Sequence, residues 1–153
     1  MTTKVFAQRD LSFAHLQSVL ELLPDAVAEA GGGKSNPMLV AQGISAVASG
    51  TDHRFFAALT VDGVVGGFMA AVIETDIFLG VRTAREVFAW LRPSARNAEN
   101  QAALLEAFEA WATAQKAERL ECLAELGDAG ERFAAAASSR GYARASTVLR
   151  KVL

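Results

Sequence analysis

The sequence predicts a mixed α/β protein that folds as one domain, with its elements in the order β-α-α-β-β-β-α-β-α-β. Its 153 residues are enough for a single domain spanning 1–153, and an apolar fraction of 52% can supply the core. Asp62-Gly63 stands between two β-rich runs, which is a strong signal for a hairpin. Residues 97–116 instead repeat apolar side chains at helical spacing. Because strand-like and helix-like segments both occur in one short chain, the sequence favours a mixed α/β fold.

The first third of the chain predicts a short edge strand followed by two helices. The strand covers residues 4–8, and the helix after it ends at Pro24, which interrupts the apolar pattern. Three glycines at 31–33 form a flexible joint. The second helix starts at Asn36, an N-cap followed by proline, and closes at Gly50.

The middle of the chain predicts three strands. The first two cover residues 54–61 and 64–73 and flank the hairpin turn. A loop over 74–83 then leads into the third strand, 84–92, which Pro93 ends.

The last third predicts a helix, a strand, a helix and a strand. The helix over 97–116 is strongly amphipathic, and a short strand over 119–124 follows it. An alanine-rich helix over 131–140 is capped by Gly141. A final strand covers 142–153 and completes the order of elements.

Composition and charge exclude several classes of function. With 15 basic and 17 acidic residues the net charge is −2, so no nucleic-acid partner is expected. The single cysteine, Cys122, excludes an internal disulfide, and His15 and His53 lie too far apart for a metal-ligand motif, so no metal is expected. The sequence contains no run of about 18 apolar residues, so no membrane span is predicted. We therefore expect a soluble, cytoplasmic protein.

The segment over 89–111, AWLRPSARNAENQAALLEAFEAW, indicates an anion site. A strand runs through proline and an arginine-bearing turn into the start of a long helix. The first backbone N–H groups of a helix have no intrahelical partners and carry partial positive charge. Arg96 adds a cation that can contact a phosphate directly. The alternative is an ordinary strand-to-helix turn with an exposed arginine.

The same segment resembles the acyl-CoA-binding core of the GNAT (GCN5-related N-acetyltransferase) superfamily. Its matching positions are Trp90, Leu91 and Pro93 at the strand end, Arg96 in the turn, Leu104-Leu105 in the helix, and Gly141-Tyr142 where the family has Gly-Phe. The order of elements agrees from about residue 5 to the C-terminus. The resemblance implies a GNAT fold, and the glycine-poor loop is similar to that of phage and prophage members.

Three positions depart from the family pattern. Glu99 and Gln101 stand where the family has Gly and Gly/Ala, which let backbone amides close on the diphosphate of coenzyme A. A Glu99 carboxylate would repel a diphosphate unless it points to solvent. Ala137 stands where the family frequently has the tyrosine that acts as its general acid.

The resemblance implies acyl transfer from acetyl-CoA, used as a co-substrate, to an amine on a small molecule or a protein. The implied donor-binding residues are Trp90, Leu91, Arg96, Asn97, Ala98, Glu99, Asn100 and Gln101. A backbone N–H near Leu91 would polarise the thioester carbonyl.

A base must also remove a proton from the amine. Glu86 is the candidate, because strand alternation places it with Phe88 and Trp90, where apolar surroundings would raise its pKa. The alternative for Glu86 is an exposed carboxylate paired with Arg82 or Arg85. Tyr142, or Ser138 and Ser139, could protonate the departing thiolate.

Two other functions remain open at the level of sequence. One is a non-catalytic GNAT-fold binding or assembly subunit that has lost tight coenzyme A binding, which Glu99, Gln101 and Ala137 favour. The other is a domain that senses acyl-CoA without turnover. An exposed terminal strand could also pair two copies into a homodimer.

Overall fold

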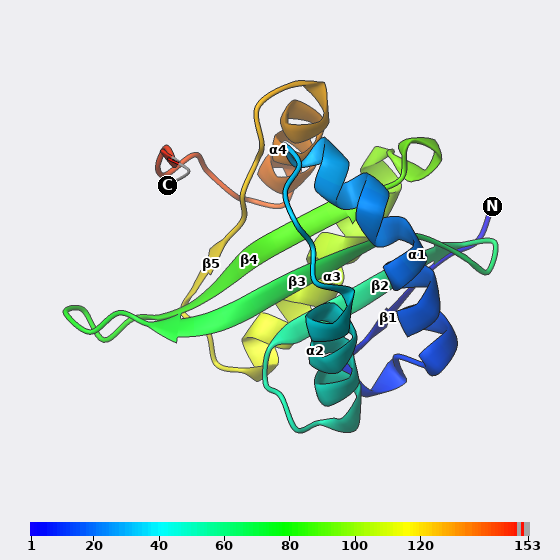
Figure 1. Ribbon diagram of the computed structural model, residues 1–153. Coiled ribbons are helices and arrows are strands. Elements are labelled where there is room, and N and C mark those ends of the chain that lie inside the picture. Colours follow the sequence, from blue (N-terminus) through cyan, green and yellow to red (C-terminus); the bar gives the residue numbers. More distant parts are fainter. Residues whose placement is uncertain (150, 152–153) are drawn as a thin grey trace.

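A five-stranded sheet forms the centre of the protein, with helices on both faces (Figure 1). The computed structural model describes residues 1–149 and 151. The strands lie in the order β1-β2-β3-β4-β5; neighbours are antiparallel except β4 and β5, which are parallel. Their bounds are β1 Thr3–Ala7, β2 Phe55–Val61, β3 Val64–Thr75, β4 Arg82–Leu91 and β5 Arg119–Glu121.

The helices divide into two layers and bury a separate core on each face of the sheet. Helices α1 (Phe13–Glu29) and α2 (Pro37–Ser49) cover one face, and α3 (Ala98–Ala114) and α4 (Asp128–Ser139) cover the other. Short 3-10 turns cover Gln8–Asp10 and Pro93–Ala95. Because β2 is covered on both sides, its run of apolar residues is buried almost throughout. The mixed sheet and four helices confirm the predicted fold class.

Helix α1 is longer than the sequence predicts. It continues through Pro24 and ends at Glu29, so the expectation that it stops at the proline is wrong. Proline costs a helix one N–H donor, yet Leu23 and Ala26 on either side of it are buried in the core below. This tertiary packing outweighs the local penalty. The extra turn carries Glu29 toward strand β4.

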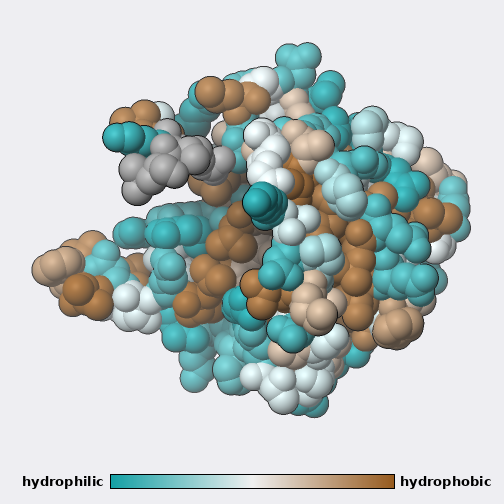
Figure 2. Space-filling model, viewed as in Figure 1, coloured by the Kyte–Doolittle hydropathy of each residue, from teal (hydrophilic) through white to brown (hydrophobic). Residues whose placement is uncertain are grey.

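The hairpin of β3 and β4 is also longer than predicted, since the two strands pair from Gly67–Leu91 out to Thr75–Arg82. The Asp76 carboxylate accepts hydrogen bonds from two backbone amides of the turn, at 2.8 Å each. Figure 2 shows this hairpin tip projecting from the body, where Ile77 and Phe78 are 89% and 90% exposed.

A β-bulge in β4 reverses the faces of its side chains. Ala71 pairs with Glu86 and Ala70 pairs with Phe88, so Val87 is an extra residue. Paired residues share a face, and Ala71 belongs to the core under α3 and α4 whereas Ala70 belongs to the core under α1 and α2. Glu86 therefore faces α3 and α4, and its predicted placement with Phe88 and Trp90 is wrong.

The predicted terminal strand is absent from the described part of that segment. Residues 142–149 and 151 have no regular secondary structure, and positions 150, 152 and 153 lie outside the described residues. Pairing in a sheet is stabilised by a buried face, but every side chain from 143 to 149 is exposed. The other predicted elements form with ends shifted by a few residues. No helix in residues 1–149 and 151 is long and apolar enough to cross a membrane.

Candidate active site

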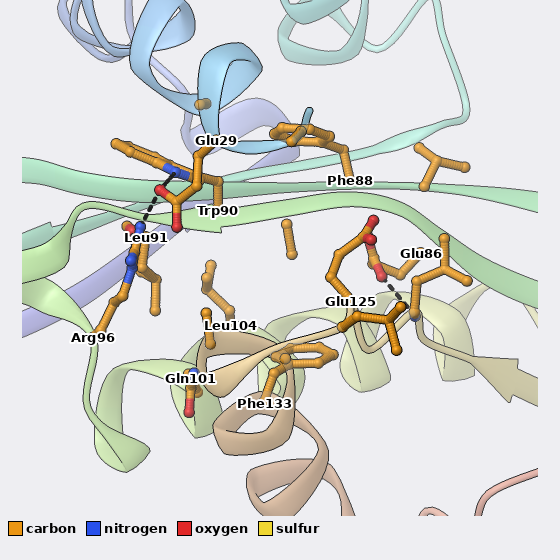
Figure 3. A pocket seen from close by; sticks show the side chains of 18 residues that line it. Glu29, Glu86, Phe88, Trp90, Leu91, Arg96, Gln101, Leu104, Glu125 and Phe133 are labelled. Atoms are coloured by element: carbon orange, nitrogen blue, oxygen red, sulfur yellow. Dashed lines mark hydrogen bonds and ion pairs between the residues drawn. The ribbon is translucent and has the colours of Figure 1, made fainter. Parts of the chain in front are cut away.

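A cleft opens where strands β4 and β5 part. The two strands pair only from Thr83–Arg119 to Arg85–Glu121, and beyond this point they diverge. The resulting cleft has a volume of about 330 Å³ and runs along residues 86–91 of β4. The end of α1 lines it on one side of the sheet, and α3 and α4 line it on the other (Figure 3).

Glu86 lies at the inner end of this cleft and is 2% exposed. Its Oε2 accepts a hydrogen bond of 2.9 Å from the backbone N–H of Leu123, which follows β5. The pKa of Glu86 is raised to about 7, because burial, with a smaller contribution from the charge of Glu125, outweighs the lowering by the Leu123 amide. The carboxyl group therefore titrates near neutral pH, as a base for an amine requires.

The alternative that Glu86 is an exposed carboxylate paired with Arg82 or Arg85 is wrong. Arg85 forms ion pairs with Glu74 and Glu121, at 2.9 and 3.0 Å. The Arg82 side chain donates to the backbone carbonyl of Gln115, 2.8 Å away.

Backbone amides of β4 face the cleft beside this carboxylate. The Arg92 N–H donates to the Gly66 carbonyl at 2.8 Å, which makes these residues a hydrogen-bonded antiparallel pair. Donors alternate along such a ladder, so the N–H groups of Ala89 and Leu91 point away from β3. Because β5 has already diverged, these amides are directed into the cleft, where an oxyanion could accept from them.

Two asparagines shape the start of α3. Asn97 is the N-cap, and its Oδ1 accepts from the Asn100 N–H at 2.8 Å. The Asn100 side chain is fully buried; it donates to the Ala95 carbonyl and accepts from the Thr3 hydroxyl, at 2.8 and 2.7 Å. The predicted donor-binding asparagines therefore use their side chains to hold the turn, which leaves backbone amides for an anion.

Ala98 and Glu99, the first two residues of α3, are exposed. Their N–H groups precede the first intrahelical bond, from Gln101 N–H to the Asn97 carbonyl. The Glu99 side chain thus has access to solvent, the condition under which its carboxylate is compatible with an anion at this helix end.

Arg96 is already bound within the protein. Its Nε donates to the Leu91 carbonyl at 2.8 Å, and its Nη2 forms an ion pair with Glu29. The indole N–H of Trp90 donates to the same Glu29 oxygen at 2.9 Å. Burial would raise the pKa of Glu29, but the hydrogen bonds from Trp90 and Arg96 outweigh it and lower the pKa.

Glu29 is a cleft residue that the sequence prediction missed. Trp90 and Arg96 lie 61 and 67 positions away along the chain. No local pattern marks such a contact, and a helix that ended at Pro24 would not have carried Glu29 to the cleft.

Gln101 and Leu104 line the cleft from α3. The Gln101 side chain is largely buried, with 6% of the residue exposed. It fills space that a glycine or alanine would leave open.

Tyr142, the predicted proton donor, does not line the cleft. It packs against the core under α3 and α4, close to Cys122 and Glu109, where burial raises the pKa of its hydroxyl. Ser138 and Ser139 are also away from the lining, and the Ser139 hydroxyl donates to the Ala136 carbonyl at 2.7 Å. The structure thus brings Glu86 to the cleft and leaves the three hydroxyl candidates outside it.

No group of three or more His, Cys, Asp or Glu side chains in the described part of the chain is placed to hold a metal ion. The chain matches no protein-family model and no curated protein sequence.

Solved structures of N-acetyltransferases share the fold over nearly the whole chain. AAC(6')-Iy, solved with the bisubstrate analogue CoA-S-monomethyl-acetylneamine, is 16% identical with a TM-score of 0.74, covering 100% of this chain and 99% of that one. The aminoglycoside acetyltransferase HMB0005 from an uncultured soil metagenomic sample is 14% identical, with a TM-score of 0.73 and coverage of 100% and 99%. Glucosamine-6-phosphate N-acetyltransferase from Arabidopsis thaliana is 9% identical, with a TM-score of 0.73 and coverage of 99% of each chain.

The protein therefore has the fold of the GNAT acetyltransferases, as the motif resemblance implies. The solved neighbours with this fold are N-acetyltransferases, and some were solved with coenzyme A or an analogue of it.

Proposed function

We propose that this protein transfers an acyl group from acyl-CoA to an amine. The observation that carries the proposal is the cleft between β4 and β5, which brings outward-facing strand amides and a buried carboxylate together with Arg96, beside the N-terminus of α3. This combination offers an anion site, an oxyanion site and a base along one channel.

The acyl donor is proposed to bind along the edge of β4. Its phosphates would contact Arg96 and the first amides of α3, at Ala98 and Glu99, and its thioester would lie by Ala89 and Leu91. Apolar walls from Leu104 and Phe133 would exclude water from the acyl arm.

In the proposed reaction the amine nitrogen attacks the thioester carbon. The carbonyl oxygen gains negative charge and accepts from the Ala89 or Leu91 N–H. Glu86 takes the proton that the attacking nitrogen loses, directly or through a water. The carbon–sulfur bond then breaks, and the same proton passes to the thiolate, so the products are an amide and coenzyme A. This route does not need Tyr142.

The acceptor is proposed to be an amine on a small molecule or a protein. The neighbours named above include enzymes for aminoglycosides and for glucosamine-6-phosphate. A homodimer, a cytoplasmic location and a phage-type source stay predictions from the sequence.

A second candidate is a non-catalytic GNAT-fold subunit, or a domain that senses acyl-CoA without turnover. The ion pair of Arg96 with Glu29 favours it, because the cation expected to contact phosphate already has a partner. The absence of Tyr142 from the lining agrees with this alternative.

Thermal-shift titration with acetyl-CoA, followed by a thiol-release assay over a panel of amines, separates these functions. Binding should stabilise the protein by RT ln(1 + [L]/Kd), about 2.7 kcal/mol at 100-fold excess over Kd. Glu86→Gln should keep this shift and lose roughly 100-fold or more in turnover. Glu106→Gln, an exposed carboxylate on α3, is the matched control and should keep both.

Two outcomes would contradict the enzyme, and a third would contradict only the assignment of its base. No shift at millimolar acetyl-CoA would exclude enzyme and sensor together and leave the non-catalytic subunit. A shift without thiol release from any amine would favour the sensor. Full turnover in Glu86→Gln would remove Glu86 as the base.

A further inference from the structure

The lining of the cleft is acidic as well as apolar. Three carboxylates reach it, from Glu29 at the end of α1, Glu86 on β4 and Glu125 after β5. Among the residues that the structure describes, Arg96 is the only basic one in the lining. Above pH 7, where Glu86 is charged, the carboxylates outnumber the Arg96 guanidinium and create a negative potential in the cleft, which attracts a cationic ligand.

The carboxylates lie on two sides of the sheet. Figure 3 shows Glu29 and Trp90 on the side of α1, and Glu86 with Phe133 on the side of α3 and α4. Glu29 can be reached by a ligand, since its side chain is 42% exposed. The aromatic rings of Phe88 and Trp90 line the same part of the cleft. Aromatic faces beside a carboxylate are typical surroundings for an organic ammonium group.

Gln101 adds a neutral polar group to the lining on the side of α3. Its carboxamide could bond a polar ligand bound in the cleft.

We propose that Glu29 binds an ammonium group of the acceptor, and that the acceptor is therefore a cation with two or more amino groups. This inference rests on the proposed function. An amine held as ammonium at Glu29 cannot attack, because its nitrogen has no free electron pair. A second amino group must then reach the thioester and lose its proton toward Glu86, on the other side of β4.

The ion pair of Glu29 with Arg96 couples the two substrates. Arg96 is anchored through its Nε on the Leu91 carbonyl, so its Nη groups can exchange partners without loss of that anchor. A donor phosphate beside Arg96 would compete with Glu29 for the guanidinium. Binding of the donor thereby frees the Glu29 carboxylate for the acceptor, and each substrate strengthens binding of the other.

Titration calorimetry tests this coupling. Spermidine is the cationic probe, and coenzyme A, which has no acyl group to transfer, takes the place of the donor. Ionic strength is held constant, because salt screens weak charge contacts. Saturating coenzyme A should tighten spermidine binding at least about five-fold in the wild-type protein. Glu29→Gln should bind coenzyme A equally well or better and show no tightening. Glu21→Gln, an exposed carboxylate on the same helix, should behave as wild type.

The outcomes separate this inference from the proposed function. Coenzyme A that binds without tightening spermidine overturns the role of Glu29 alone. Tightening that persists in Glu29→Gln overturns it as well. If coenzyme A does not bind at millimolar concentration, the proposed function falls and the inference falls with it.

Discussion

Replacing Glu86 with glutamine should stabilise the protein, and the gain should grow with pH. The wild-type carboxyl group is 2% exposed and its pKa is raised to about 7, mainly by burial. A glutamine has nearly the same shape and can still accept the hydrogen bond from the Leu123 N–H. The substitution therefore removes the titration of this site and leaves its packing in place.

The magnitude follows from the two pKa values of Glu86. The unfolded chain releases this proton near the ordinary pKa of 4.5, whereas the folded protein keeps it up to about 7. Stability from the neutral carboxyl is thus fully present below pH 4.5 and is lost as the pH rises to about 7. The two pKa values differ by about 2.5 units, and each unit corresponds to roughly 1.4 kcal/mol. The wild-type free energy of unfolding therefore falls by about 3 kcal/mol between pH 4.5 and pH 7.

Chemical unfolding of both proteins at pH 5 and pH 8 measures this effect. Most of the wild-type loss lies between these two pH values. The difference in free energy of unfolding between Glu86→Gln and wild type should therefore be about 2 to 3 kcal/mol larger at pH 8 than at pH 5. The exposed carboxylate variant Glu106→Gln should show no such trend. A constant difference between Glu86→Gln and wild type at the two pH values would refute the raised pKa of Glu86.

Two further substitutions test the frame of the cleft. Gly67→Ala should destabilise the protein by roughly 1–3 kcal/mol in thermal unfolding. The added Cβ would lie 2.4 Å from Leu91 Cδ2 and 2.5 Å from the Trp90 carbonyl oxygen. A stability equal to wild type would contradict this packing. Asn100→Ala should lower the free energy of unfolding in urea by roughly 2–4 kcal/mol, because the Ala95 carbonyl and the Thr3 hydroxyl lose their partner. A loss below about 0.5 kcal/mol would contradict that hydrogen-bond network.

Local signals in the sequence were enough to predict most of the fold. Asp62-Gly63 forms the expected turn between β2 and β3, and Asn36 caps α2 with proline at the first helical position, as predicted. Such features depend on neighbours within a few residues, which a sequence displays directly. The terminal strand was predicted wrongly because alternation alone does not provide a buried face.

The candidate site was predicted less completely because its geometry depends on distant contacts. The sequence placed Glu86 on the third of the middle strands and Arg96 in the turn after it. The partners of both side chains, Leu123 and Glu29, come from other parts of the chain. Contacts across such separations depend on the tertiary fold, and they decide whether each charged group is free.

The bulge at Val87 links the divergence of the strands to the position of Glu86. Parallel pairing with β5 ends at Arg85, so the bulge lies just where β4 loses its neighbour. A bulge bends its strand and increases the local twist, which favours divergence of the two strands at this point. The same extra residue turns Glu86 toward α3 and α4 while Phe88 faces α1 and α2. Without it, Glu86 would share a face with Phe88, and the cleft would have no carboxylate on the side of α3 that could bond the Leu123 amide.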